Sequence, residues 1–148
     1  MILPDFKAFP RVGRILGVDW GARRTGVAVS DASREFVFTR PSVVVSHSDD
    51  IALQIAQLAT TEKVVGIVIG LPVHGDGTES DTTVMVREFA NQLAKSTDIP
   101  ICFIEENLTS ITAQEQMGRV RVRDIKQRLD SESARVILEN AISVIRRA

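Results

Sequence analysis

Cysteine is nearly absent from this sequence, since Cys102 is the only one in 148 residues. An internal disulfide framework and a cysteine-rich zinc site are therefore excluded, and a reducing compartment is favoured. Because Cys102 lies inside an apolar run, we expect it to behave as a small buried hydrophobic residue.

Long apolar runs are also missing. No stretch approaches the roughly 18 consecutive apolar residues that span a membrane. Residues 1–13 carry two prolines and mixed charge in place of the basic and then apolar segments of a secretion signal. We expect these residues to form a short surface arm, followed by a single domain at 14–148, in a cytoplasmic protein with no membrane association.

A large net charge is the third absence, since 18 basic and 19 acidic residues leave a formal net charge of −1. Contact with nucleic acid would have to come from local basic clusters. Arg23 and Arg24 form one cluster, and residues 118–128 contain the other. The second cluster consists of Arg119, Arg121, Arg123, Lys126 and Arg128. Such charges usually belong to a solvated surface, but beside a carboxylate site they would hold a phosphate backbone, and we favour that second interpretation.

The most informative local pattern lies in residues 14–31, RILGVDWGARRTGVAVSD. Two short apolar runs flank a charged turn that contains glycine, a pattern typical of a β-hairpin. It leaves Asp19 at the end of a buried strand, where a carboxylate is costly unless a hydrogen bond, a cation or a metal satisfies it. The residues alone leave open whether the N–H groups of the turn or a metal is the partner.

The rest of the chain alternates between apolar strands and amphipathic helices. Further strands are expected at 36–45 with an interruption near Pro41, at 64–71 and at 99–104, and helices at 49–60, 80–95, 109–117 and from about Asp130 onward. Strands joined by short turns should pair antiparallel, and strands joined through helices should pair parallel. The order predicts one α/β domain with a mixed five-stranded sheet and helices on both faces.

Three acidic residues have special positions: Asp19 ends the first strand, Glu106 follows the last strand, and Asp130 opens the final helix. If the strands before Asp19 and Glu106 are neighbours, their carboxyl ends share one rim of the sheet, to which a packed helix could bring Asp130. Three carboxylates are ligands suited to Mg²⁺ or Mn²⁺. The residues alone leave two alternatives open, a solvated Glu106 at a strand end and Asp130 as an ordinary helix N-cap.

Four sequence blocks together resemble the YqgF family. The blocks VDWGARRTGVAVSD, IGLPVHGDGTES with VREFANQL, EENLTS and LDSESARVILE occur in the order and spacing of that family, over about residues 16–139. Its members have been described as Holliday junction resolvases and as pre-16S rRNA nucleases. The resemblance implies an RNase H-like three-layer fold and metal-binding catalytic residues at Asp19, Glu106 and Asp130. It also implies a hydrolase that cleaves phosphodiester bonds at the 5′ end of precursor 16S rRNA, with Mg²⁺ or Mn²⁺ as cofactor.

Two positions depart from the family's pattern. Asn107 stands where the family usually has arginine, and because arginine grips phosphate or carboxylate bidentately, a positioning contact is in question. Glu132 stands where the family often has a small residue, and we interpret it as favourable to the N-terminus of the last helix.

Three other functions stay open from the sequence. The first is a resolvase of four-way DNA junctions, which would call for a homodimer because it cuts two strands symmetrically. The second is an actin-like ATPase or sugar kinase, whose phosphate loop the first block also resembles, although those proteins need two lobes. The third is a non-catalytic RNA-binding assembly factor. The sequence leaves open whether the protein is a monomer or a homodimer.

Overall fold

The computed structural model describes residues 1–44, 48–107 and 122–148. Its strands form a single six-stranded sheet with the order β1-β6-β5-β2-β3-β4. The strands are β1 (Ile2–Leu3), β2 (Ile15–Asp19), β3 (Arg24–Ser30), β4 (Val37–Val44), β5 (Gly66–Val73) and β6 (Ile101–Asn107). The helices are α1 (Ser48–Thr61), α2 (Asp81–Ser96) and α4 (Val122–Arg147). The helix expected at 109–117 lies outside the described residues.

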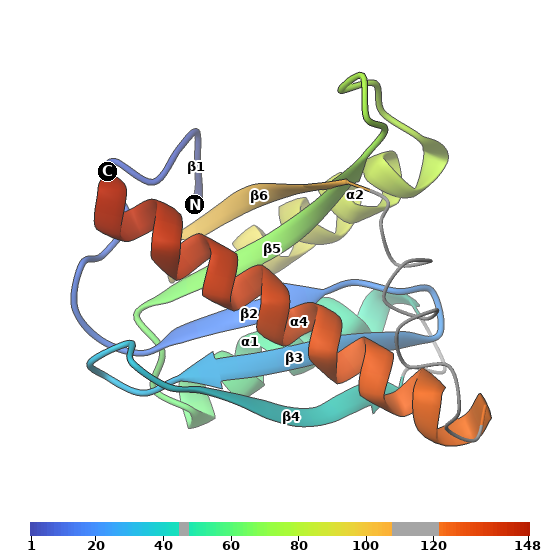
Figure 1. Cartoon of the computed structure of the whole chain (residues 1–148), viewed down its shortest axis with the longest axis horizontal. Helices are drawn as coiled ribbons and strands as arrows, with labels where there is room; N and C mark the ends of the chain where they lie inside the picture. The colour runs from blue at the N-terminus through green and yellow to red at the C-terminus, as the bar shows by residue number, and fades with distance from the viewer. Residues whose placement is uncertain (45–47, 108–121) are drawn as a thin grey trace.

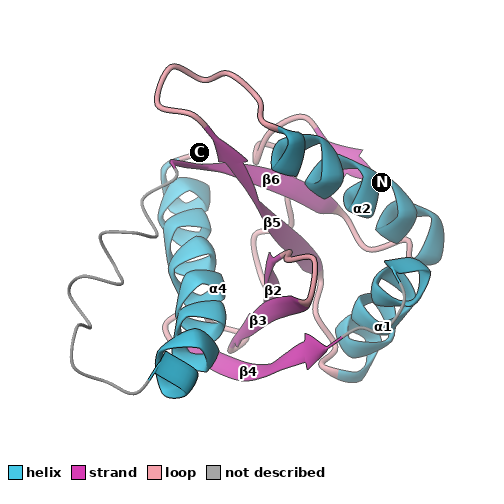
Figure 2. Cartoon of the chain, turned by 90° about the vertical axis from the view of Figure 1, so that its right-hand side faces the viewer, coloured by secondary structure: helices cyan, strands magenta, loops and turns pink. Residues whose placement is uncertain are grey.

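The sheet lies between two helical layers, as Figure 2 shows: α1 and α2 cover one face, and α4 crosses the other. Figure 1 shows α4 running diagonally over the sheet. The apolar face of α4 is buried there, and consists of Ala134, Ile137, Leu138, Ala141, Ile142 and Ile145. The prediction of an α/β domain with helices on both faces is confirmed.

Strand pairing follows the expected rule. β2 pairs with β3, and β3 with β4, in antiparallel fashion, whereas β2 with β5 and β5 with β6 pair parallel. The expected interruption near Pro41 is a bulge in the edge strand β4, because Thr25 pairs with Val43 while Val27 pairs with Arg40. Proline is tolerated on such an edge, where its missing N–H faces no partner strand.

Residues 1–13 differ from the expected surface arm. Ile2–Leu3 form β1, which pairs parallel with β6 and adds a sixth strand to the predicted five. Phe6 and Phe9 are buried and meet edge to face, with ring centroids 5.5 Å apart. Phe9 occupies the space above Gly66, since a Cβ at Gly66 would lie 2.3 Å from the Phe9 ring. Burial of the two aromatic rings anchors the segment to the sheet.

The end of β6 and the start of α4 also differ from the predicted positions, and both differences concern the predicted site. β6 continues to Asn107, so Glu106 is part of the strand rather than a residue that follows it. α4 begins at Val122, so Asp130 lies inside a helix rather than at its N-cap. The residues before Asp130 include Lys126, Gln127, Arg128 and Leu129, which favour helix strongly enough to carry it past a good capping residue.

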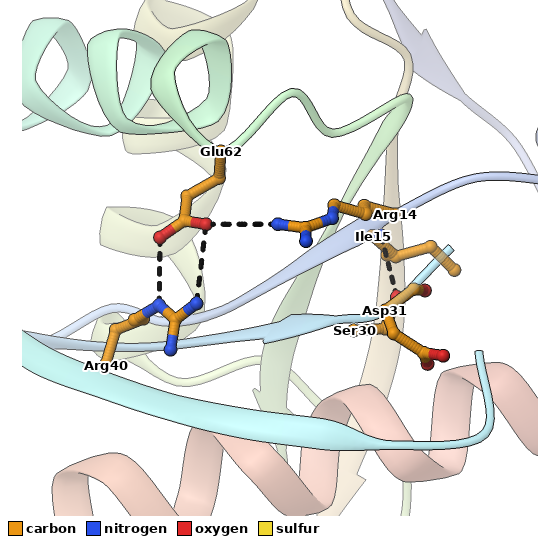
Figure 3. A network of polar contacts seen from close by, with 6 residues as sticks. All are labelled: Arg14, Ile15, Ser30, Asp31, Arg40 and Glu62. Carbon is orange, nitrogen blue, oxygen red and sulfur yellow. Dashed lines mark hydrogen bonds and ion pairs between the residues drawn. The ribbon is translucent and has the colours of Figure 1, made fainter. Parts of the chain in front are cut away.

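The start of β2, at the other end of the strand from Asp19, is held by ion pairs, which Figure 3 shows. Glu62, just after α1, accepts hydrogen bonds from Arg40 Nε at 2.8 Å and from Arg14 Nη1 at 3.5 Å. Ser30 Oγ accepts a hydrogen bond from the Ile15 backbone N–H at 2.9 Å. These contacts tie α1, β3 and β4 to the start of β2.

Candidate active site

Asp19 and Glu106 lie at the same end of the sheet, at the carboxyl ends of β2 and β6. The two strands are not neighbours, because β5 runs between them. Two strand spacings therefore separate their backbones, about 10 Å. The condition that the two strands be neighbours is therefore not met, but both carboxylates still border one rim, on either side of the end of β5.

Both carboxylates belong to the face of the sheet that α4 covers. Ile15 packs in the cluster under α4, and Gly17 lies against Leu138 of α4, so alternation along β2 places Asp19 on the same face. Along β6, Cys102 and Ile104 pack in that cluster, and Glu106 follows in the same alternation. The rim is thus formed by two carboxylates that both project on the α4 side.

Gly70 of β5 lies between these two carboxylates. Because Val18 pairs with Ile69, Asp19 is level with Gly70, and Gly70 in turn pairs with Ile104. A Cβ at Gly70 would lie 2.4 Å from Ile137 Cδ1 and 3.5 Å from Glu106 Cγ. The missing side chain lets Ile137 of α4 and the stem of Glu106 approach the same part of β5.

The Glu106 carboxylate is incompletely satisfied. Its Oε1 atom is buried and has no hydrogen-bond partner among the described residues. Burial raises the pKa of Glu106 above its usual value, and a hydrogen bond from the side chain of Asn140 on α4 offsets part of that rise. A buried carboxylate oxygen without a donor is costly, so the arrangement favours a cation as its partner.

Asp130 is placed only at the level of the backbone. It lies in α4 one turn before Ala134, whose carbonyl oxygen faces the Gly17 region of β2. Among the side chains that the structure describes, no three His, Cys, Asp or Glu residues gather closely enough to hold a metal ion. The side chain of Asp130, the third expected ligand, is outside that set.

Five of the seven predicted basic residues belong to described segments around the same end of the molecule. Arg23 is exposed in the turn that follows Asp19, and Arg24 begins β3. Arg123, Lys126 and Arg128 fall in the first turns of α4. Figure 1 shows α4 beginning beside the end of the sheet at which β2 ends. Arg119 and Arg121 lie outside the described residues.

Comparison with known proteins agrees with this architecture. The family model for RuvX, described as a Holliday junction resolvase, matches residues 13–144. The chain belongs to the RuvX (YqgF) family. The match includes Asp19, Glu106 and Asp130, and it confirms the family that the four sequence blocks indicated.

Relatives of this RuvX chain share roughly a third of its residues over most of its length. A protein of Maridesulfovibrio salexigens named "Putative pre-16S rRNA nuclease" is 36% identical over 128 residues, 85% of this chain and 95% of that protein. A protein of Rhodopirellula baltica with the same name is 34% identical over 142 residues, 93% of this chain and 81% of that protein.

Solved structures show the same fold at low sequence identity. Thermus thermophilus RuvC in complex with a Holliday junction substrate has a TM-score of 0.56 and 10% identity, and covers 91% of this RuvX chain and 96% of its own. A second structure of Thermus thermophilus RuvC has a TM-score of 0.51 and covers 88% of this chain. The RNase H-like architecture expected from the resemblance is confirmed.

Two residues of the site were missed by sequence reasoning. Gly70 stands within the quoted block IGLPVHGDGTES, but its role depends on which strands flank β5. Asn140 carries no sequence signal, because only the crossing of α4 over the sheet brings it to Glu106.

Glu132 does not lie at a helix N-terminus as expected, since α4 begins at Val122. Glu132 lies inside this helix and forms an ion pair with Arg135.

Proposed function

We propose that this protein is a metal-dependent nuclease that hydrolyses phosphodiester bonds during 5′-end processing of precursor 16S rRNA in the cytoplasm. The observation that carries the proposal is the pair Asp19 and Glu106 on one face of one rim, with a buried Glu106 oxygen that has no partner among the described residues. Membership of the RuvX family and the names of the relatives support the same activity.

The residues present fit a hard divalent cation. Asp19 and Glu106 offer oxygen ligands only, and the buried Oε1 of Glu106 gains in stability from a positive charge. Carboxylate oxygens without nitrogen or sulfur ligands suit Mg²⁺ or Mn²⁺. We assign Asp19, Glu106 and Asp130 as the residues that hold this cofactor.

A divalent cation bound by carboxylates activates water and stabilises the leaving oxygen of a phosphodiester. The chain itself supplies the anionic oxygens and holds them in place on the rigid strands β2 and β6. The rim would repel a phosphate backbone on its own, so nearby cations must offset its charge. We assign that binding role to Arg23, Arg24, Arg119, Arg121, Arg123, Lys126 and Arg128.

A four-way DNA junction is the second candidate substrate. Two observations favour it: the family model carries the description Holliday junction resolvase, and the fold is shared with Thermus thermophilus RuvC, solved with such a junction. Symmetric cleavage of two strands requires two active sites, hence a two-fold dimer. A protein that is strictly monomeric in solution favours RNA.

A non-catalytic assembly factor is the third candidate. Asn107 favours it, because an amide cannot replace the charge that arginine brings to a phosphate or carboxylate. Under this hypothesis Asp19→Asn leaves cellular rRNA processing intact, whereas under the nuclease hypothesis it abolishes processing. The actin-like ATPase alternative needs two lobes, whereas the described residues form a single sheet with two helical layers.

The test is cleavage of a 5′-extended 16S rRNA fragment and of a four-way DNA junction by the wild type, Asp19→Asn and Glu105→Gln. Glu105 is exposed and precedes Glu106 on the other face of β6, so its variant is a matched control. Cutting of the RNA near the mature end by the wild type and the control, in Mn²⁺ and not in EDTA, supports the proposal. Equal cutting by Asp19→Asn overturns it, and cutting of the junction alone favours the resolvase.

A further inference from the structure

Side chains of α4 approach Glu106 beside Gly70 of β5. The Cβ position of Gly70 is 2.4 Å from Ile137 Cδ1 and 3.5 Å from Glu106 Cγ, so Ile137 and the stem of Glu106 share the space above this glycine. Asn140 lies three residues after Ile137, which is one helical turn further along α4. The helix therefore brings Asn140 toward the carboxylate at the place where β5 has no side chain.

Asn140 interacts with Glu106 as a neutral donor. Its side-chain amide hydrogen-bonds to the Glu106 carboxylate, while Oε1 of the same carboxylate stays buried and without a partner among the described residues. An amide restricts the rotation of a carboxylate without neutralising it. An arginine or lysine at this position would instead form an ion pair with Glu106 and compete with any cation.

We propose that Asn140 is a positioning residue that orients Glu106 so that its second oxygen faces a divalent cation at the rim. The inference rests on the proposed function, because it assumes that Glu106 is a metal ligand. Asn140 acts through Glu106 in the manner of the hydrogen-bonding partners that orient metal ligands generally, whose loss weakens metal binding by about 10–100-fold.

The test is the affinity for Mn²⁺ alone, measured by calorimetry on protein stripped with EDTA. Asn140→Ala is expected to weaken binding at least about 10-fold, and Asn140→Gln, which keeps the amide, is expected to recover part of that loss. Asn91→Ala is the matched control, since Asn91 is exposed on α2, which covers the other face of the sheet. It should bind Mn²⁺ as the wild type does.

Asn140→Arg and Asn140→Asp give two further readouts that a merely structural role would not produce. In EDTA, Asn140→Arg should raise the Tm by pairing with Glu106, and the variant should no longer bind Mn²⁺. Asn140→Asp should lower the Tm in EDTA through repulsion from Glu106, and added Mn²⁺ should raise its Tm by more than it raises that of the wild type. The proposal is overturned if, in EDTA, Asn140→Arg lowers the Tm and Asn140→Asp raises it.

Cleavage kinetics separate positioning from direct catalysis. For Asn140→Ala the Mn²⁺ concentration that gives half-maximal rate should rise at least about 10-fold, while kcat at saturating Mn²⁺ recovers to near the wild-type value. If the wild type binds Mn²⁺ and Asn140→Ala binds it equally well, the positioning role alone is overturned. If the wild type does not bind Mn²⁺, the metal site in the proposed function is wrong and the role of Asn140 falls with it.

Discussion

Glu62 and Glu106 are two partly buried glutamates at opposite ends of the sheet, and their surroundings differ in charge. Glu62 accepts hydrogen bonds from Arg40 and Arg14, and the bond from Arg40 is the main reason that its pKa lies below the usual value (Figure 3). Among the described residues, Glu106 meets an amide from Asn140 and no charged partner, and burial raises its pKa. Two arginines neutralise Glu62, whereas no side chain in the described part of the chain forms an ion pair with Glu106.

This difference separates a structural carboxylate from a candidate ligand. Glu62 joins the end of α1 to β2 and β4, so its charge is part of what holds the elements together. Glu106 keeps a buried oxygen without a donor among the described residues, an arrangement that lowers stability unless something binds there. Local rules of packing are commonly broken at functional sites, so the unsatisfied oxygen of Glu106 supports the proposal that the rim binds a cation.

The largest expected effect is on activity, from Glu106→Gln. The amide keeps the shape of the side chain but removes the charge that holds the cation, so cleavage of the rRNA fragment in Mn²⁺ should fall about 100-fold or more. Measurement of kcat for Glu106→Gln, the wild type and Glu105→Gln checks this prediction. An unaltered rate in Glu106→Gln would remove Glu106 from the catalytic set.

The same variant should not lose stability. Oε1 of this partly buried carboxylate has no donor among the described residues, so replacing the carboxylate by a neutral group removes a desolvation cost. The Tm of Glu106→Gln in EDTA should therefore equal or exceed that of the wild type. A lower Tm would indicate that Glu106, like Glu62, has a structural role.

The next effect concerns Gly70→Ala, which fills the space beside Glu106. Its new methyl group would lie 2.4 Å from Ile137 Cδ1, so the buried Ile137 side chain must move, at a cost of about 1–3 kcal/mol in the free energy of unfolding. Urea denaturation of Gly70→Ala with and without Ile137→Val tests this, because the smaller side chain should recover part of the loss. Gly75→Ala is the control, since nothing lies within 4 Å of its Cβ position.

Glu62→Gln should cost about 1 kcal/mol in the free energy of unfolding at pH 7, through loss of the ion pairs with Arg40 and Arg14. The folded pKa of Glu62 lies below the usual value of 4.5 for a glutamate, so this stability is present above pH 4.5 and is lost as pH falls through the folded pKa. Denaturation of both proteins between pH 7 and pH 3 should therefore show the difference shrinking toward the acid end. A difference that grows on acidification would contradict the assigned direction.

The smallest effect is expected from Arg14→Ala. Arg14 meets Glu62 at 3.5 Å and its side chain is 44% exposed, whereas Arg40 meets it at 2.8 Å. Exposed pairs contribute little, so Arg14→Ala should cost no more than about 0.5 kcal/mol and Arg40→Ala should cost more. Equal losses in urea denaturation of the two variants would show that both arginines hold Glu62 to the same degree.

Much of the fold follows from local sequence. The hairpin of β2 and β3 has two apolar runs around a charged turn, and the parallel pairing of β2, β5 and β6 follows from the helices between them. β1 could not be predicted, because Ile2 and Leu3 pair with residues about a hundred positions away. The start of α4 was misplaced, since a good capping pair at Asp130 and Ser131 is overridden by strong helix formers before it.

The candidate site was predictable only in part. Asp19 and Glu106 end apolar runs, and strand ends in an open α/β sheet border a shared crevice, so their position on one rim follows from the pattern. That β5 separates them, and that Gly70 leaves space there, depends on strand order. Asn140 reaches Glu106 because α4 crosses the sheet diagonally, and that crossing arises from packing between distant parts of the chain (Figure 1).

The most direct test of a metal site at Asp19 and Glu106 is a crystal structure of the wild type soaked in Mn²⁺, with the metal located in the anomalous difference map. A Mn²⁺ peak is expected at the rim above Gly70, coordinated by Asp19 and by the Oε1 atom of Glu106. A map with no peak at this rim, or with Mn²⁺ bound only elsewhere, would contradict the assignment of these carboxylates as the metal site.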